Sequence, residues 1–529
     1  MKKWITLMIL LTLTACNGAF DAPVTPTVTR PAIPTRVSNP GVPGTFELAP
    51  CPFALPEDYV QGQHVDCGYL LVPENRHVDV EQARTIRLAV AIFHPPGGAA
   101  HPDPILFLHG GPGASVLETL RYQFEEGFAP LFAAQRDVVF FDQRGVGRSE
   151  PALDCPNVDG LLLDLLDREL DGRPVTEWQA DALLIAAFRD CAAELRQDAD
   201  LSAYHTAASA ADVDDLRRAL DYEQVNLWGG SYGTRLALSV MRDYPKGLRS
   251  VVLDAVYPPD VDLYAEAPAN LHRALDRLFG SCTANSVCRA NYPHLAQAFW
   301  DTVARLDAAP AHVPITHTLT GQSYPTTLSG NGLIGFVFTI LYETELRYML
   351  PQIIYDASQD RFDSLAVIRG ALLPQVTTSS RGASLSVQCH DEIAFSSPEA
   401  FESALKQYPQ LLGYYEHAML GRLTYQVCEF WGAEEADPVE NEPVVSDVPA
   451  LVMVGEFDPI TPPAWAERAA ETLSHGYYFE YPGVGHGASA SPGCPRQMMI
   501  AFLEDPTAAP DSACIADMGQ PWSQPSETR

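Results

Sequence analysis

The sequence has little positive charge, and lysine is almost missing from it. Its only lysines are Lys2, Lys3, Lys246 and Lys406, and 34 basic residues stand against 67 acidic ones, for a formal net charge of −33. A chain this acidic repels phosphate backbones, which argues against a nucleic-acid partner. The charge favours solubility but does not specify a fold. No feature of the sequence indicates a protein partner.

The sequence also lacks a hydrophobic run long enough to cross a membrane comfortably. The apolar stretch 4–13 follows two lysines and leads into Leu-Thr-Ala-Cys at 13–16, which predicts a signal peptide at 1–16. Its end resembles the lipobox of bacterial lipoproteins, in which cleavage precedes a cysteine that carries lipid. We therefore expect an exported chain, anchored to the membrane through Cys16 or secreted. An ordinary signal peptide with a chance cysteine is the alternative.

A paired CxxC motif, which would indicate a zinc site, is missing as well. Eleven cysteines are present, and setting Cys16 aside leaves an even number, as expected in an oxidising compartment. We predict no metal and no organic cofactor. The sequence does not fix the disulfide connectivity, but pairing of neighbours along the chain gives these candidates: Cys51–Cys67, Cys155–Cys191, Cys282–Cys288, Cys389–Cys428 and Cys494–Cys514.

Strand and helix patterns alternate through much of the chain, which predicts an α/β fold with a mostly parallel sheet. The alternation stops near 258, the following residues look mainly helical, and strand patterns return at 450–454 and 477–481. We divide the chain into a signal peptide (1–16), a Pro- and Thr-rich tether (17–50), a first core segment (51–258), a helical lid insertion (259–445), a second core segment (446–515) and a tail (516–529).

The segment 229–233 reads Gly-Gly-Ser-Tyr-Gly and matches the pattern G-x-S-x-G. A predicted strand precedes it and a predicted helix follows it, as a nucleophile elbow requires. Such a turn raises the serine hydroxyl above the sheet, and the helix start directs N–H groups toward a developing oxyanion. We predict Ser231 as a nucleophile; a structural serine in a glycine-rich turn is the alternative.

A second glycine-rich loop, His-Gly-Gly-Pro-Gly at 109–113, follows the predicted strand 105–108. Acyl transfer needs two N–H donors directed at the tetrahedral oxyanion. We expect one donor from Tyr232, which follows the nucleophile, and the other from Gly111. A plain turn is the alternative.

A serine nucleophile needs a base, and the base needs an acid that orients it. In chain order these partners should follow the serine as acid and then base. Asp458 lies in a loop after one late strand, and His486 lies between glycines after the last strand. We predict Asp458 as the acid, with Glu456 as its rival, and His486 as the base. His475 is the competing candidate for the base. It precedes its strand, so it would lie at the wrong end of the sheet.

Five motifs together carry a resemblance to a known family: HGGPG at 109–113, DQRGVGRS at 142–149, GGSYG at 229–233, GEFDPITPP at 455–463 and GVGHG at 483–487. They resemble the proline iminopeptidase and tripeptidyl aminopeptidase group of α/β-hydrolase serine peptidases. The resemblance implies an α/β-hydrolase fold with an inserted, mainly helical lid, and the triad named above. For Asp142 and Arg144 we expect a structural role, as an ion pair under the site. The cysteine-rich C-terminus is more similar to the tripeptidyl aminopeptidases.

Aminopeptidases recognise a free α-ammonium group, and in this family carboxylates of the lid do so. The resemblance indicates Asp391, Glu392 and Glu429 for this role, because a Cys389–Cys428 bridge would bring them together. A solvated acidic face is the alternative.

The sequence as a whole predicts a serine hydrolase that acts on peptides outside the cell. We expect an aminopeptidase that releases N-terminal residues or tripeptides through an acyl-enzyme. A carboxylesterase with the same triad is the second hypothesis, and a catalytically inactive peptide-binding lipoprotein is the third.

Overall fold

The computed structural model describes residues 42–79, 82–374, 378–434, 436–519 and 522. The predicted signal peptide, Cys16 and most of the predicted tether lie outside the described residues, as does most of the predicted tail. Within the described part of the chain, no helix is both long and apolar enough to cross a membrane.

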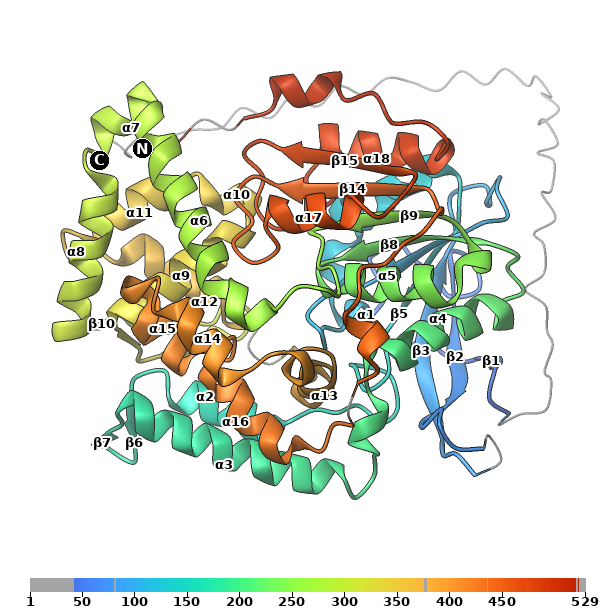
Figure 1. Cartoon of the computed structure of the whole chain (residues 1–529), viewed down its shortest axis with the longest axis horizontal. Helices are drawn as coiled ribbons and strands as arrows, with labels where there is room; N and C mark the ends of the chain where they lie inside the picture. Colours follow the sequence, from blue (N-terminus) through green and yellow to red (C-terminus); the bar gives the residue numbers. More distant parts are fainter. Residues whose placement is uncertain (1–41, 80–81, 375–377, 435, 520–521, 523–529) are drawn as a thin grey trace, which may run out of the picture. The chain divides into compact units, whose positions relative to one another are not determined.

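A nine-stranded sheet forms the centre of the fold (Figure 1), in the order β1-β2-β3-β5-β4-β8-β9-β14-β15. β1, β2, β3 and β5 pair in antiparallel fashion, and the strands from β5 to β15 run parallel to one another. β4, β5 and β14 are buried throughout, which explains their continuous apolar sequences. The strands are β1 Thr45–Leu48, β2 Val65–Pro73, β3 Thr85–Phe93, β4 Ile105–Leu108, β5 Val138–Phe141, β8 Val225–Gly230, β9 Leu248–Asp254, β14 Ala450–Gly455 and β15 Gly476–Tyr481.

Helices cover both faces of this sheet, because alternate side chains of each buried strand point to opposite faces. Leu106 and Leu108 of β4 pack in one core with helices α4, α5 and α17. Ile105 and Phe107 pack in the other core with α1 and α18. These helices are α1 Val116–Gln123, α4 Thr206–Ala219, α5 Tyr232–Asp243, α17 Pro463–Ala470 and α18 Cys494–Glu504.

A mainly helical region, here called the lid, lies between β9 and β14 in the chain, although these two strands are neighbours in the sheet. Much of it packs on an apolar core of its own that includes Leu271, Phe299 and Val337. Its helices are α6 Leu263–Ala284, α7 Ser286–Asn291, α8 Leu295–Ala308, α9 Gly330–Tyr342, α10 Thr344–Arg347, α11 Leu350–Ala357, α12 Asp363–Leu372, α13 Arg381–Asp391, α14 Pro398–Leu405, α15 Leu412–His417 and α16 Arg422–Trp431. Two small antiparallel ribbons complete it: β10 Ala311–His312 with β13 Thr327–Leu328, and β11 Ile315–Thr316 with β12 Ser323–Tyr324. The predicted fold class is confirmed, whereas the exact division into domains stays a prediction.

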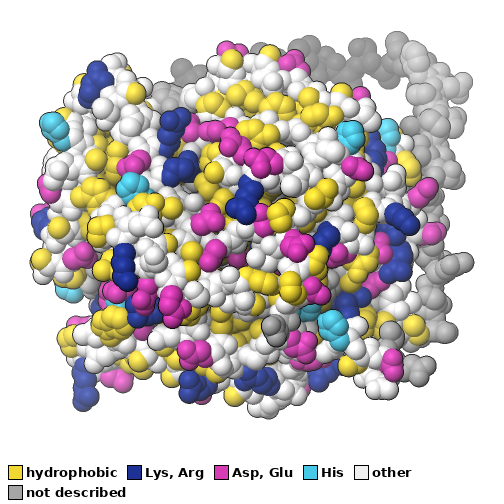
Figure 2. Space-filling view, viewed as in Figure 1, with side chains coloured by type: hydrophobic (Ala, Val, Ile, Leu, Met, Phe, Trp, Pro, Cys, Tyr) yellow, Lys and Arg dark blue, Asp and Glu magenta, His cyan; other side chains and the backbone are white. Residues whose placement is uncertain are grey.

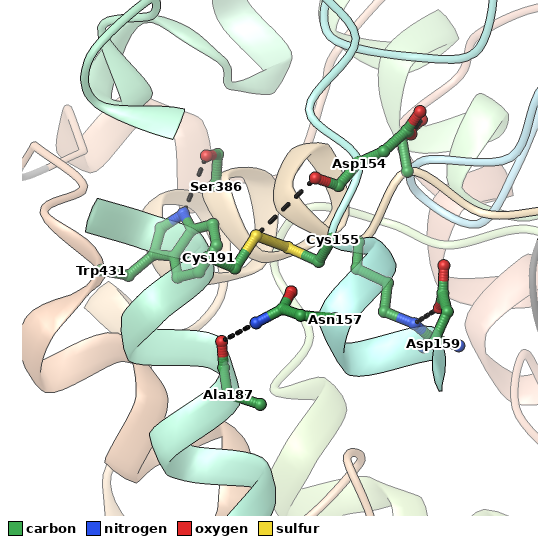
Figure 3. Close-up of a disulfide and its surroundings, with 10 residues drawn as sticks. Asp154, Cys155, Asn157, Asp159, Ala187, Cys191, Ser386 and Trp431 are labelled. Atoms are coloured by element: carbon green, nitrogen blue, oxygen red, sulfur yellow. Dashed lines mark hydrogen bonds and ion pairs between the residues drawn. A yellow bond between two sulfur atoms is a disulfide. The ribbon is translucent and has the colours of Figure 1, made fainter. Parts of the chain in front are cut away.

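A helical hairpin from the first core segment packs against this lid, which the sequence did not indicate. It consists of α2 Pro156–Asp164, the short ribbon β6 Glu169–Leu170 with β7 Arg173–Pro174, and α3 Glu177–Leu195. Figure 3 shows the Cys155–Cys191 disulfide, which ties the start of α2 to α3, close to Trp431 of α16. The Trp431 indole donates a 2.9 Å hydrogen bond to Ser386 of α13. The disulfide thus holds the hairpin together, and the hairpin shares one apolar core with Trp431 of the lid.

All five predicted disulfides are present. The bonded pairs are Cys51–Cys67, Cys155–Cys191, Cys282–Cys288, Cys389–Cys428 and Cys494–Cys514. Each closes a short loop of the chain, as expected when segments that are adjacent in sequence pack together.

The expected ion pair between Asp142 and Arg144 is wrong. Arg144 binds Asp212 of α4 with two nitrogens, each 2.7 Å from a carboxylate oxygen. Asp142 instead accepts hydrogen bonds from Ser115 Oγ at 2.8 Å and from the Arg148 N–H at 2.9 Å. The chain turns sharply after β5, so the two side chains diverge. Burial raises the pKa of Asp142 to about 6, although these hydrogen bonds oppose the shift.

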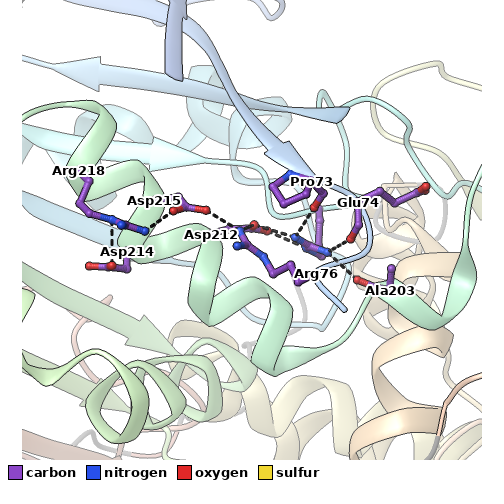
Figure 4. Close-up of polar contacts among 9 residues, drawn as sticks. Pro73, Glu74, Arg76, Ala203, Asp212, Asp214, Asp215 and Arg218 are labelled. Atoms are coloured by element: carbon purple, nitrogen blue, oxygen red, sulfur yellow. Dashed lines mark hydrogen bonds and ion pairs between the residues drawn. The ribbon is translucent and has the colours of Figure 1, made fainter. Parts of the chain in front are cut away.

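Asp212 is the centre of a buried ionic network that joins the antiparallel strands to α4 (Figure 4). Arg76, which follows β2, binds both Asp212 and Asp215, the latter at 2.8 Å. At the outer end of the network, Asp215 pairs with the exposed Arg218. Charge is thus compensated from the buried end to the surface.

Replacing Arg144 with methionine should lower the free energy of unfolding by about 3–5 kcal/mol, because it removes one partner of a buried ion pair. Urea denaturation followed by circular dichroism measures this. The matched change Arg218→Met, at the exposed end of the network, should cost less than about 1 kcal/mol. If both variants lost the same small amount of unfolding free energy, the buried pair would contribute no more to stability than the exposed one.

Candidate active site

The carboxyl ends of the parallel strands bring the predicted site residues to one edge of the sheet, because parallel strands all end on the same side. Each of the following strands leads directly into a site segment: β4 into the loop 109–113, β8 into Ser231, β9 into Asp254, β14 into the loop of Asp458, and β15 into the loop of His486.

Ser231 occupies a strained turn between β8 and α5, with φ 55° and ψ −126°. Non-glycine residues hold such a conformation only where the surrounding structure enforces it. The Ser231 N–H donates a 2.9 Å hydrogen bond to the Asp254 carbonyl at the end of β9. The turn also requires glycine at position 233, because a Cβ there would lie 1.9 Å from the Leu108 carbonyl oxygen. Tight packing against both neighbouring strands thus fixes the serine.

The loop 109–113 lies directly beside the serine. A Cβ on Gly110 would lie only 2.8 Å from Ser231 Cβ. The Gly110 N–H is already used, since it donates to His109 Nδ1 at 2.8 Å. Burial lowers the pKa of His109 to about 4, which keeps this imidazole neutral and able to accept. The N–H groups of Gly111 and Tyr232 therefore stay the candidates for binding the oxyanion. Tyr232 is the first residue of α5, so its N–H has no acceptor within the helix.

His486 and Asp458 form a hydrogen bond of 2.8 Å between Nδ1 and Oδ2. Asp458 is fully buried, and its carboxylate also accepts from the N–H groups of Ile460 and Thr461 at 3.0 and 2.9 Å. The Thr461 hydroxyl adds a fourth donor at 2.7 Å. These donors fix the orientation of the acid, and through it the orientation and tautomer of the imidazole.

The pKa of His486 is raised above its ordinary value. Burial is the largest single effect and lowers the pKa, but the charge of Asp458 and its hydrogen bond, helped by Asp254 and Glu343, outweigh it. The imidazole also packs against Tyr342 at the end of α9, with 4.5 Å between ring centroids. The lid therefore contributes to the immediate surroundings of His486.

The two rival residues have other contacts. Glu456 pairs with Arg277 at 2.6 Å and accepts from the Gly483 N–H at 2.8 Å. His475 is exposed just before β15, at the opposite edge of the sheet from the serine. The geometry therefore supports Asp458 as the acid and His486 as the base.

Asp254 is a buried site residue that sequence reasoning missed. Its carboxylate accepts from the N–H groups of Ala488 at 2.8 Å and Ser489 at 2.7 Å, and so fixes the loop that carries His486. Burial raises the pKa of Asp254, more than these hydrogen bonds lower it. A signal was present, because Asp254 is the last residue of the strand that follows the nucleophile strand in the chain.

Arg273 of α6 also supports the site, and nothing in the sequence indicated it. Its guanidinium donates to the carbonyl oxygens of Glu456 and Asp458. Arg273 therefore fixes the backbone of the loop that carries Asp458, and it does so from the lid. Only the tertiary structure reveals this contact.

The predicted acids of the lid do not form an open anionic site. Asp391 and Glu392 are 1% and 5% exposed, and both face Arg235 of α5, at 3.9 and 2.9 Å. Burial raises the pKa of Glu392 to about 7, although Arg235 opposes the shift. The Cys389–Cys428 bridge is present, but Glu429 is exposed on α16. The expected open site of all three acids is therefore wrong, because Asp391 and Glu392 are buried against Arg235 whereas Glu429 is exposed.

The strongly acidic composition does not produce one anionic patch on the face shown in Figure 2. Acidic and basic side chains are interspersed there among apolar ones. Charge on this face therefore favours solubility more than attraction of one oppositely charged macromolecule.

Fold and site together define the class: the chain has the α/β-hydrolase fold. The model of the alpha/beta hydrolase fold matches residues 103–291, and the model described as TAP-like protein matches residues 417–514. Serine protease Hip1 of Mycobacterium tuberculosis is 22% identical over 494 residues, which is 90% of this chain and 92% of that protein. The tripeptidyl aminopeptidase of Streptomyces coelicolor is 30% identical over 206 residues, 37% of this chain and 36% of that one.

Among solved structures, the proline iminopeptidase of Mycobacterium smegmatis covers 83% of this chain and 98% of its own, with 17% identity and a TM-score of 0.38. The resemblance to the proline iminopeptidase and tripeptidyl aminopeptidase group is confirmed by the TAP-like match and by these sequence relatives.

The structure predicts a pH dependence for hydrolysis. The base must be neutral, so kcat/KM should fall as the pH drops through the pKa of His486, which lies above the ordinary 6.5. Asp458→Asn should reduce kcat by about 10⁴, the effect known for the corresponding change in chymotrypsin-like enzymes, because the wrong tautomer is then favoured.

The acid limb of the pH–rate profile, measured on a peptide anilide, tests this, with Glu456→Gln as the matched control. An acid limb at or below 6.5, or equal damage from the two changes, would contradict the assignment. A fluorophosphonate probe should label the wild-type chain and leave Ser231→Ala unlabelled.

Proposed function

We propose that this α/β hydrolase is a serine aminopeptidase, which releases N-terminal residues or tripeptide-sized fragments from peptides. The observation that carries the proposal is the buried hydrogen bond between His486 and Asp458, at the sheet edge where Ser231 occupies its strained turn. Relatives described as serine protease, tripeptidyl aminopeptidase and proline iminopeptidase support the peptide substrate.

In the proposed reaction, the Ser231 hydroxyl attacks the scissile carbonyl while His486 Nε2 accepts its proton. The N–H groups of Gly111 and Tyr232 stabilise the oxyanion. His486 then gives the proton to the leaving amine, which leaves an ester between the acyl group and Ser231. A water molecule, deprotonated by the same imidazole, hydrolyses this ester. Asp458 stays charged and stabilises the imidazolium in both halves of the reaction.

The environment of the histidine suits the general-acid step of amide hydrolysis. An amine is a poor leaving group and must be protonated as it departs, whereas an alkoxide depends less on this step. Asp458 and Asp254 both stabilise the protonated form of His486. His486 can therefore act as the general acid that an amide bond requires. A carboxylesterase would use the same triad, so the choice of a peptide substrate rests on the relatives.

Recognition of a free amino terminus requires a carboxylate that lacks its own counterion. Asp391 and Glu392 face Arg235 and are compensated by it. Glu343 follows Tyr342, whose ring packs on His486, and its charge raises the pKa of that histidine. Burial, and then the charge of Glu345, raise the pKa of Glu343, which marks a partly dehydrated carboxylate. We therefore assign the α-ammonium of the substrate to Glu343.

The test compares a tripeptide anilide that has a free amino terminus with its N-acetylated twin. A desolvated charge pair is worth about 2–5 kcal/mol, so the free peptide should have a kcat/KM at least about thirtyfold higher. Glu343→Gln should abolish this preference, whereas the matched change at the exposed neighbour, Glu345→Gln, should keep it.

Equal cleavage of both peptides by the wild-type chain would contradict the aminopeptidase. If simple esters alone were hydrolysed, the chain would be a carboxylesterase. The Ser231→Ala variant, assayed with each of these substrates, controls for background hydrolysis.

We also propose that the chain is exported and anchored through a lipid on Cys16. The support is the short apolar stretch that follows two lysines and precedes this cysteine. In an exporting bacterial host, the wild-type chain should be found in the membrane fraction. Cys16→Ala should shift it to the soluble fraction, as judged by immunoblotting. If both forms were found in the same fraction, the anchor would be disproved.

A further inference from the structure

A buried cluster of two histidines and two carboxylates lies beside α5, outside the catalytic residues. Its members are His205, His390, Asp391 and Glu440, and one potential ligand atom of each lies within 4.8 Å of all the others. They come from three separate segments: the turn before α4, the end of α13 and the 3₁₀ turn Pro438–Asn441. The tertiary structure alone brings them together.

Two ring nitrogens in this cluster have no hydrogen-bond partner among the residues that the structure describes. They are His205 Nδ1 and His390 Nε2. The two histidines are only 7% and 4% exposed, and their ring centroids lie 4.1 Å apart. Buried polar atoms in native proteins almost always have a partner, so two such nitrogens within one cluster of side chains require an explanation.

The orientation of His390 indicates what the missing partner is. Its Nδ1 lies 2.9 Å from the carbonyl oxygen of Glu434, so Nδ1 carries the hydrogen and donates it. Nε2 faces the carboxylate of Glu440 at 3.5 Å, which is too long for a direct hydrogen bond. A lone pair and a carboxylate repel each other unless a proton or a cation lies between them. Metal-binding histidines are held in this way, with the other ring N–H bonded to a carbonyl or carboxylate.

We propose that His205, His390, Asp391 and Glu440 bind a divalent transition-metal ion, with Zn²⁺ as the expected occupant. Zn²⁺ takes four nitrogen and oxygen ligands in a tetrahedral arrangement at about 2.0–2.2 Å. Ca²⁺ and Mg²⁺ are disfavoured, because half of this ligand set is imidazole nitrogen and these ions prefer oxygen. The two carboxylates balance the charge of the dication.

The existing contacts of the carboxylates leave room for the ion. Asp391 accepts from the hydroxyl of Thr206, and Glu440 accepts from the Asp437 N–H at 3.2 Å. A carboxylate offers about four lone-pair positions, so each acid keeps free positions for a metal. Arg235 lies 3.9 Å from Asp391 but pairs more closely with Glu392, at 2.9 Å.

The ion would connect the lid to the core behind the nucleophile. Asp391 ends α13, and the neighbouring Cys389 bonds α13 to α16. Thr206, which bonds to Asp391, also lies 2.7 Å from the hydroxyl of Tyr232, the residue after Ser231. The site is therefore structural in our proposal, and its loss should loosen the lid without removing a reacting group.

The experiment uses the whole exported chain, stripped with a chelator and titrated with Zn²⁺ at pH 7.5. We expect one equivalent to bind and the unfolding midpoint to rise with the metal concentration. Co²⁺ in place of Zn²⁺ should give the visible absorption of tetrahedral nitrogen and oxygen coordination. None of these readouts depends on hydrolysis, so their failure would leave the proposed peptidase activity untouched.

Two variants and two matched controls identify the ligands. His390→Gln and Glu440→Gln should weaken Zn²⁺ binding by at least about a hundredfold, the upper end of what is lost with residues that only support a ligand. His475→Gln and Glu442→Gln, at exposed positions outside the cluster, should bind as the wild type does. Fluorophosphonate labelling of Ser231 shows that each variant is folded. If His390→Gln does not fold, Glu440→Gln, at the edge of the cluster, still tests the proposal.

Absence of stoichiometric binding by the wild-type chain would overturn the proposal. So would undiminished binding in both cluster variants. The cluster would then be a doubly protonated His390 held between Asp391 and Glu440.

Discussion

The parallel alignment of β4, β8, β9, β14 and β15 decides where every group of the proposed active site lies. Because these strands end at the same edge of the sheet, the loops that follow them converge there. Ser231 can keep its positive φ only because β8 and α5 are buried on either side of it and position 233 has no side chain. The strain is thus maintained by the packing of the whole sheet, and the serine is positioned before any substrate binds.

A layer of buried carboxylates around His486 depends on that alignment. Asp458 orients the ring directly, while Asp254 fixes the loop that carries it and so connects nucleophile and base through one strand end. Both acids are buried but satisfied by several N–H donors, which is the condition under which buried charge is tolerated. The lid completes the site, with Arg273 on the acid-bearing loop and Tyr342 on the imidazole.

Arg235 determines how the lid and the nucleophile helix meet. It lies one turn after the nucleophile and binds Asp391 and Glu392 of the lid, which therefore act as internal partners of the core. Asp391 also belongs to the histidine cluster, so one acidic pair joins α5, α13 and the turn before α4. Glu343, from another part of the lid, interacts electrostatically with His486 and has no ion pair with an arginine or lysine among the residues that the structure describes.

The sequence by itself determined the strands, the Gly-Gly-Ser-Tyr-Gly turn, and the order of Ser231, Asp458 and His486, because each depends on local patterning and on the chain order of one sheet. Pairing of neighbours along the chain suggested the disulfides, but only the tertiary structure fixed their connectivity. The sequence did not determine the partner of Arg144, the inward-facing pair at 391–392, the role of Asp254, or the cluster around His205 and His390. Those depend on contacts between segments far apart in the chain, whose side chains meet only once the lid has packed against the core, and no local pattern encodes them.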